Sequence, residues 1–446
     1  MKPAGFSNNG PKGFRIMFRS LQYRNYRLFF SGQSVSLIGT WIQRIATPWL
    51  VYHLTGSAFL LGLVGFAGQI PTFLIAPFAG VLTDRHNRYY ILIATQILAM
   101  VQAFLLAILY LTGTIAVWHI VLLSVFLGIV NAFDVPARQS FVVEMVEKKE
   151  DLGNAIALNS TMVNGARLLG PSIAGMLIAL TGEGICFLLN AVSYIFVIIS
   201  LLMMKVNPRV IKKKDTHVLD ELKDGFSYAF GFPPIRYIIL LLALVSLMGM
   251  PYTVLMPVVA KDILHGGPHT FGFLMGASGL GALTGALYLA SRKNVLGLTK
   301  LIPLAAALFG IGLVAFSFSH IFTLSMFLMI FIGMGMMLQM ASSNTILQTV
   351  VEDDKRGRVM SLYTMAFMGA APFGSFMAGS LAKTIGVSYT ILMGGILCVA
   401  GAALFSTRLP RLNRLVHPIY VQMGFIPAEV SAGIQSATEL TVPPEE

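Results

Sequence analysis

Two arginines lie deep within apolar segments of the sequence, where a charged side chain needs a compensating environment. Arg44 belongs to the apolar segment 26–53 and Arg167 to the segment 153–180. An arginine at the centre of a bilayer costs about 2.5–3.5 kcal/mol on insertion scales, so it usually faces a polar cavity or a partner. We therefore predict that both line one polar cavity and attract anionic or phenolic groups; the alternative is that they anchor helices through backbone carbonyls. Weaker candidates for the wall of this cavity are Gln33, Trp41, Gln43, Asn131 and Gln339.

A carboxylate lies near the end of the apolar segment 117–138. Asp134 and Arg138 are four residues apart, a spacing that lets two side chains pair along one face of a helix. Partial burial of an acid favours its protonated form, which suits a carrier of protons. We predict that this pair takes part in proton coupling; the alternative is an interfacial ion pair without that role.

A charged loop, GVLTDRHNR at positions 80–88, follows the second apolar segment. Gly80 would let a neighbouring helix approach closely. Asp84 falls at a helix C-terminus, where the macrodipole disfavours an acid, so it needs a partner such as Arg85, Arg88 or the N-terminus of another helix. We predict a latch whose charges meet in one conformation and separate in the other. The alternative is an ordinary basic loop with one acid.

Small residues and a proline recur in the segment 153–180, at Gly165, Gly170, Pro171 and Gly175. Small residues let helices pack closely in lipid, and proline removes a backbone donor and bends the helix. The pattern predicts a tightly packed hinge or seal, with generic helix packing as the alternative.

The sequence offers no arrangement that supports catalysis or metal binding. Cys186 and Cys398 stand alone, and the residues between His265 and His269 are Gly-Gly-Pro, which breaks a helix that would align the two imidazoles. It also lacks a phosphate-cradling Gly-Lys-Ser run, a His-rich cluster and a nucleophile elbow. We therefore predict that the protein is not an enzyme and has no cofactor and no metal site.

Composition points to a membrane protein. Of the 446 residues, 56% are apolar and 11% are charged, against about 25% charged in soluble domains. Apolar runs near 20 residues recur, and each can cross about 30 Å of hydrocarbon as a helix. The net charge of +12 comes from basic residues scattered between these runs, which argues against nucleic-acid binding. We predict an all-α polytopic fold with transmembrane helices at 26–53, 58–82, 89–112, 117–138, 153–180, 185–205, 236–260, 270–290, 298–317, 321–345, 359–381 and 388–407.

The distribution of basic residues predicts the orientation, because cytoplasmic loops collect lysine and arginine. All but four of the 31 lysines and arginines lie on the side shared by both termini, so both termini should be cytoplasmic. The domains expected in chain order are a cytoplasmic segment (1–25), a six-helix bundle (26–205), a cytoplasmic linker with an amphipathic helix (206–235), a second six-helix bundle (236–407) and a disordered cytoplasmic tail (408–446).

The two halves also match in sequence. Gly153, Gly165, Gly170 and Gly175 have counterparts at the same spacing in Gly357, Gly369, Gly374 and Gly379. Repeats of this kind build pseudo-symmetric transporters whose substrate site lies between the halves.

The loop at positions 80–88 resembles the Gly-x-x-x-Asp-Arg-x-Gly-Arg signature of the major facilitator superfamily. Asn87 replaces the second glycine, a mild change because asparagine tolerates the left-handed turn conformation. The corresponding loop of the second half lacks the acid, so the implied latch is one-sided. The Gly-Pro pattern around Pro171 resembles the motif of the superfamily's antiporters, which favours export.

Segments 39–44, 50–57 and 131–139 are similar to the branch that contains the bacterial enterobactin exporter and related secretion permeases. The resemblance implies a monomeric transporter of the bacterial inner membrane that exports siderophores, drugs or metabolites by alternating access, with the proton as coupling ion. The first span lacks the membrane-embedded acid of many drug/proton antiporters. The alternatives are a transporter of lysophospholipid or other lipid-like substrates and a non-transporting membrane receptor.

Overall fold

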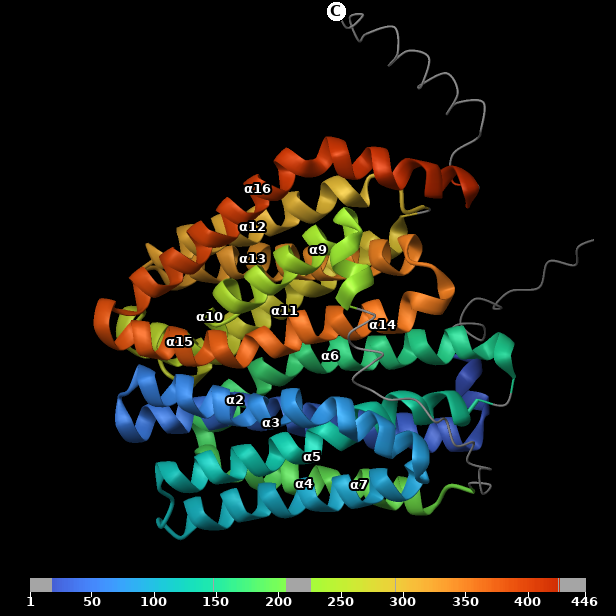
Figure 1. Ribbon diagram of the computed structural model, residues 1–446. Helices are drawn as coiled ribbons and strands as arrows, with labels where there is room; N and C mark the ends of the chain where they lie inside the picture. Colours follow the sequence, from blue (N-terminus) through green and yellow to red (C-terminus); the bar gives the residue numbers. More distant parts are fainter. Residues whose placement is uncertain (1–17, 147, 206–225, 293, 424, 426–446) are drawn as a thin grey trace, which may run out of the picture. The chain divides into compact units, whose positions relative to one another are not determined.

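The computed structural model describes residues 18–146, 148–205, 226–292, 294–423 and 425 of the chain (Figure 1). All regular secondary structure in these residues is helical, which confirms the predicted all-α fold. The linker helix expected within 206–235 falls mostly outside the described residues, and so do the first 17 residues.

The chain divides into two compact units. Unit 1 takes in described residues of the ranges 1–56, 67–215 and 266–276, and unit 2 takes in those of 57–66, 216–265 and 277–446. The elements before the linker are η1 (Arg19–Gln22), α2 (Arg24–Thr55), α3 (Ala58–Arg85), α4 (Arg88–Leu111), α5 (Val117–Glu144), α6 (Lys149–Thr181) and α7 (Glu183–Leu202). Those after it are α9 (Pro233–Leu244), η2 (Val245–Gly249), α10 (Tyr252–Val258), η3 (Val259–Ile263), α11 (Pro268–Ser291), α12 (Leu298–Ser317), α13 (Phe322–Val350), α14 (Asp353–Thr364), η4 (Met365–Gly369), α15 (Ala370–Ile385) and α16 (Val387–Gln422). Helices α3 and α11 contribute to both units, and the predicted division into bundles 26–205 and 236–407 stays a prediction.

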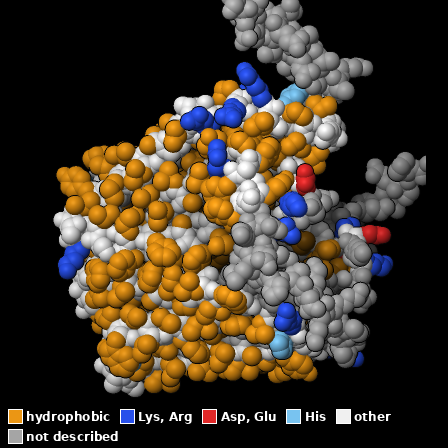
Figure 2. Space-filling model, in the orientation of Figure 1, with side chains coloured by type: hydrophobic (Ala, Val, Ile, Leu, Met, Phe, Trp, Pro, Cys, Tyr) orange, Lys and Arg blue, Asp and Glu red, His pale blue; other side chains and the backbone are white. Residues whose placement is uncertain are grey.

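Most of the described helices are suited to a bilayer. Eleven helical stretches within the described ranges are long and apolar enough to cross a membrane. Large apolar side chains lie on the outside, for example Leu180 at 82% exposure and Leu304 at 65%, and Figure 2 shows one face covered largely by hydrophobic side chains. Such exposure would be costly in water and is expected where lipid is the solvent.

Helix α2 is long enough to span a membrane but is more polar than the eleven, because it contains Gln33, Gln43 and Arg44 among its apolar residues. It packs against both α6 and α7. A methyl group at Gly39 would come within 2.5 Å of Ser193 Oγ on α7, so glycine is needed for the close approach of these two helices. The polar helix is therefore held inside unit 1 by tight packing.

Two of the predicted spans in unit 2 contain wide π-helical turns. The span predicted at 236–260 forms α9, η2, α10 and η3, and the span predicted at 359–381 forms α14, η4 and α15. The Ser246 hydroxyl in η2 donates a hydrogen bond of 2.5 Å to the Phe367 carbonyl in η4. A π turn changes the regular pairing of backbone groups, and this side chain satisfies one of the carbonyls involved.

Helix α16 extends past the predicted end of the last span at residue 407 and continues to Gln422. The prediction of a disordered tail from residue 408 is therefore wrong for 408–422. Leu412, Val416 and Tyr420 are spaced four residues apart and are all buried, so packing of one helical face stabilises this extension.

Candidate functional site

Trp41 lies close to two arginines in unit 1. The guanidinium carbon of Arg44 is 5.1 Å from the centroid of the Trp41 ring, and that of Arg167 is 5.9 Å from the same centroid. Both distances fall within the range of cation–π attraction, which tryptophan supports best among the aromatic side chains. The structure thus places the two predicted arginines, from α2 and α6, close to the same weaker candidate, Trp41.

The Gly-Pro segment of α6 shapes this contact. A methyl group at Gly170 would overlap the Trp41 side chain, so the glycine makes room for the indole ring. Pro171 is buried in the next position. A methyl group at Gly175 would come within 2.6 Å of the Pro268 carbonyl oxygen at the start of α11, whereas one at Gly165 would have no heavy atom within 4 Å. The predicted close packing is therefore present at Gly170 and Gly175 and absent at Gly165.

Gln43 belongs to a buried network of amides. Its Nε2 donates to Gln102 Oε1 on α4 at 2.9 Å, and its Oε1 accepts from Asn190 Nδ2 on α7 at 2.7 Å. Gln102 donates in turn to the Leu123 carbonyl on α5 at 3.3 Å. Gln43 thus links α2 to two other helices, with both ends of its amide engaged.

Asp134 is buried in the interior of unit 1. Its Oδ1 accepts hydrogen bonds from Thr95 Oγ1 at 3.0 Å and Gln96 Nε2 at 2.7 Å, and its Oδ2 forms an ion pair with Arg138. The i,i+4 pairing suggested by the sequence is observed, and α4 supplies two neutral donors that the sequence did not identify. Protonation of Asp134 must therefore be accompanied by loss or rearrangement of at least one of these contacts.

Arg44 and Arg138 both lie near Tyr194 of α7. No carboxylate of the described residues is within ion-pair distance of Arg44, whose side chain is exposed. The exposed guanidinium group of Arg44 therefore places a positive charge beside Trp41, an arrangement that attracts anionic or electron-rich groups.

The other candidates for the cavity wall are placed differently. Gln33 on α2 is buried and Asn131 on α5 is partly buried. Gln339 lies on α13 in unit 2; it is buried, and its Nε2 has no hydrogen-bond partner in the part of the chain that is described. Within the described part of the chain, no hydrogen bond or ion pair joins these three side chains to Trp41 or Arg44, and their roles stay predictions.

The loop between α3 and α4 was predicted to act as a latch. Arg88 forms an ion pair of 2.6 Å with Glu144 at the end of α5, Arg85 is exposed, and Gly80 has open space around it. The side chain of Asp84 lies outside the described residues. Among the described residues, Arg88 therefore joins this loop to the end of α5 by an ion pair.

The expectation that Asn87 occupies a left-handed turn in that loop is wrong. Its φ of −72° lies outside the left-handed region, and its side chain accepts a hydrogen bond from the Tyr89 amide. Asparagine therefore serves here as the N-cap of α4 rather than as a substitute for a glycine in a left-handed turn.

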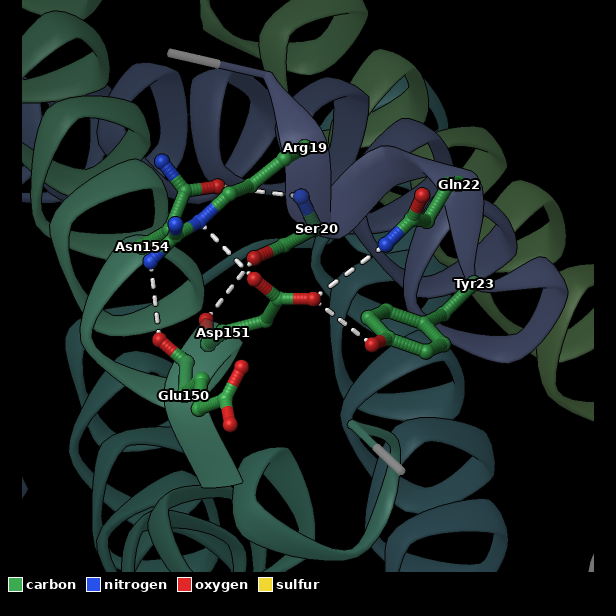
Figure 3. Close-up of polar contacts among 7 residues, drawn as sticks. All are labelled: Arg19, Ser20, Gln22, Tyr23, Glu150, Asp151 and Asn154. Carbon is green, nitrogen blue, oxygen red and sulfur yellow. Dashed lines mark hydrogen bonds and ion pairs between the residues drawn. The ribbon is translucent and has the colours of Figure 1, made fainter. Parts of the chain in front are cut away.

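A polar cluster that the sequence analysis missed fixes the start of α2 on α6. Figure 3 shows Arg19, Gln22 and Tyr23 pointing toward Asp151. The carboxylate pairs with Arg19 Nε at 2.8 Å and accepts from Gln22 Nε2 at 3.2 Å and from the Tyr23 hydroxyl at 2.7 Å. The hydrogen bond to Asp151 raises the pKa of Tyr23. Ser20 adds a bond from its amide to Asn154 Oδ1 at 3.0 Å.

A second missed cluster joins α2, α4 and α7 at the opposite end of α2. Glu183, the first residue of α7, is buried and accepts a hydrogen bond from the Tyr110 hydroxyl at 2.6 Å. His53 Nδ1 lies 3.2 Å from the other carboxylate oxygen. Polar contacts therefore hold α2 at both ends, to α6 near its start and to α4 and α7 near its end. No short-range spacing in the sequence signals either cluster, since the partners lie on different helices.

Most of the chain matches a known protein family. Residues 17–423 match a protein family described as transmembrane secretion effector. The chain is 27% identical over 392 residues to the staphyloferrin A transporter of Staphylococcus aureus, covering 87% of this chain and 97% of that protein. It is 24% identical over 393 residues to macrolide efflux protein A of Streptococcus pyogenes, covering 85% of this chain and 96% of that protein.

The fold is also shared with solved structures. A bacterial homologue of the iron transporter ferroportin, solved in an inward-facing state, superposes with a TM-score of 0.66 at 18% identity and covers 86% of this chain and 98% of its own. This likeness supports the predicted transporter fold.

Proposed function

The chain belongs to the transmembrane secretion effector family of major facilitator superfamily transporters, and from this premise we propose that it exports small molecules that carry anionic or phenolic groups. Membership confirms the predicted family and shows that the protein is a multi-pass membrane transporter rather than an enzyme. The proposal adds a direction, a class of cargo and a coupling ion.

The proposed class of cargo rests on one observation, namely that two guanidinium groups lie close to the Trp41 ring. Charge-assisted hydrogen bonds from arginine to carboxylate or phenolate are strong, and they strengthen where water is excluded. Trp41 adds an aromatic face on which a planar group can stack. A siderophore, drug or metabolite with such groups fits this chemistry, while a cargo with neither charge nor aromatic ring does not use it.

Three findings support export. The family is described by secretion, a relative is an efflux protein for macrolides, and the Gly-Pro pattern around Pro171 resembles the motif of the superfamily's antiporters. Transport by alternating access is the general mechanism of this fold, with the cargo site reached from one side at a time.

Asp134 is our candidate for proton coupling. Its carboxylate is buried with one cationic and two neutral donors, so a change in its protonation alters contacts between α4 and α5. Such a link between a proton and a helix contact is what a coupled transporter requires. Proton-driven uptake into inverted vesicles that survives Asp134→Asn would exclude this role.

We further propose that the protein is a monomer in the bacterial cytoplasmic membrane. Both termini should lie in the cytoplasm, because nearly all lysines and arginines fall on one side of the membrane. Cysteines introduced at Arg85 and Lys213 should then react with an impermeant reagent from the same side. Labelling from opposite sides would refute the topology. The native Cys186 and Cys398 are buried, which keeps the background low.

The cargo itself can be sought without assuming its identity. Metabolites in the medium of cells with and without the gene should differ in anionic or phenolic compounds, and the enriched compounds should then be transported by the purified protein in liposomes. Binding without flux in liposomes would instead indicate a receptor.

A further inference from the structure

The final part of α16 presents a basic surface. Arg408, Arg411 and Arg414 follow one another at intervals of three residues, and all three side chains are exposed. The sequence from Val387 to Phe425 contains no acid. Figure 2 shows Lys and Arg side chains gathered over this end of the helix.

The opposite face of the extension is fixed to unit 2. Leu412 and Val416 are 2% and 1% exposed, and Asn413 accepts a hydrogen bond of 2.8 Å from the Thr299 hydroxyl at the start of α12. The extension is therefore docked on unit 2 rather than free.

Neighbouring elements enlarge the positive charge. Arg236 of α9 and Arg408 both lie over the Tyr237 ring, at 5.0 Å and 5.9 Å from its centroid. Lys300, next to Thr299, is exposed as well. None of these basic residues forms an ion pair with a carboxylate of the described residues. We call this set, namely Arg236, Lys300, Arg408, Arg411 and Arg414, the α16 basic surface.

An apolar surface adjoins the basic one. Leu404, one turn before Arg408, is 64% exposed on the part of α16 that is apolar enough to span a membrane. Acyl chains can therefore cover Leu404 while the arginines reach the level of the lipid headgroups. Guanidinium groups match phosphate in geometry, and juxtamembrane basic clusters attract anionic lipids.

We propose that the α16 basic surface binds the headgroups of anionic phospholipids in the leaflet at which α16 ends. The bound lipid holds the extension of α16 against α9 and α12. The site is separate from Trp41 and its arginines, so the proposal does not depend on the identity of the cargo or on the direction of transport.

The test compares binding of phosphatidylglycerol and phosphatidylcholine to the purified full-length protein in detergent, by native mass spectrometry. The wild-type protein should prefer phosphatidylglycerol. Replacing Arg408, Arg411 and Arg414 together by glutamine should reduce that preference by about fivefold per residue and by up to roughly a hundredfold in total. Replacing all three by lysine should retain most of it, because the charge remains.

A matched control removes the same charge elsewhere. Arg27, Lys148 and Lys205 are exposed residues of unit 1, and their joint replacement by glutamine should leave the lipid preference unchanged. If the first triple variant does not fold, the single variants and a salt titration of the wild-type protein replace it, and the preference must fall as salt rises. An equal loss in both triple variants, or no loss in the α16 variant, would overturn the proposal. So would binding of inorganic phosphate that abolishes the lipid preference, since the site would then recognise a free anion.

Discussion

Arg44→Gln removes one of the two guanidinium groups beside Trp41 and leaves Arg167 in place. A hydrogen bond to a charged group contributes about 1.5–3 kcal/mol, and about 1.4 kcal/mol corresponds to a factor of ten. A Coulomb interaction at 4 Å with an effective dielectric constant near 20 gives about 4 kcal/mol, which sets an upper limit. We therefore expect export of an anionic cargo at low concentration to fall by roughly 10- to 150-fold.

The assay measures metabolites in the medium of cells that produce the wild-type protein, the variant or neither, at matched levels of protein in the membrane. Arg44→Lys keeps the charge but loses the planar fork and its stacking on the ring, so it should reduce export less than Arg44→Gln. Arg27→Gln is the control, because Arg27 is an exposed residue in the first turn of the same helix.

The reasoning would be refuted by either of two results. In the first, Arg44→Gln exports anionic compounds within twofold of the wild-type rate. In the second, the compounds that the wild-type protein exports carry no negative or phenolic group, so that a positive site would have nothing to recognise.

Asp134→Asn should abolish the dependence of transport on an imposed pH gradient and leave binding of the cargo measurable. Flux into vesicles measures the first property and equilibrium binding measures the second. Transport by the variant that still depends on the pH gradient would count against the assignment of Asp134. Gly170→Ala should displace Trp41, destabilise the fold by about 1–3 kcal/mol through overpacking and lower the rate of transport. Gly165→Ala is the control and should match the wild type, because the added methyl group has open space. Equal transport by the two variants would contradict the packing argument. The pKa of Tyr23 is raised in the folded protein, so its contribution to stability is complete below the unfolded value near 10 and is lost as pH rises through the folded value. The melting temperature of the wild type should therefore fall more steeply above pH 10 than that of Tyr23→Phe, and parallel curves would refute this.

The fold could be predicted from the sequence because the bilayer demands long apolar segments, and their length alone reveals the helices. Arg44 and Arg167 could be identified for the same reason, since their cost in lipid makes them conspicuous. Their common neighbour Trp41 was a weaker candidate, because a tryptophan in an apolar segment carries no such signal.

Contacts between distant helices could not be predicted. Gln43 bonds to residues 59 and 147 positions away in the sequence, and Asp151 bonds to Tyr23 across 128 positions. No local spacing specifies which helices become neighbours, so Gln43 was assigned to a cavity wall although its amide joins three helices. The end of α16 was misjudged for a related reason, because docking of Leu412 and Val416 stabilises a segment that looks polar on its own.

The π-helical turn η4 has a consequence for any comparison of the two halves. Gly165 on α6 and Gly369 in η4 are counterparts in the sequence repeat, yet α6 is a regular α-helix and only the later segment contains the wide turn. Beyond η4 the counterparts nevertheless meet equivalent neighbours: a methyl group at Gly379 would approach Gly62 and the Ala58 carbonyl oxygen of α3, as one at Gly175 would approach Gly272 and the Pro268 carbonyl oxygen of α11. The wide turn of η4 therefore leaves this helix contact in register. Substitutions at Gly175 and Gly379 can accordingly be compared directly across the repeat.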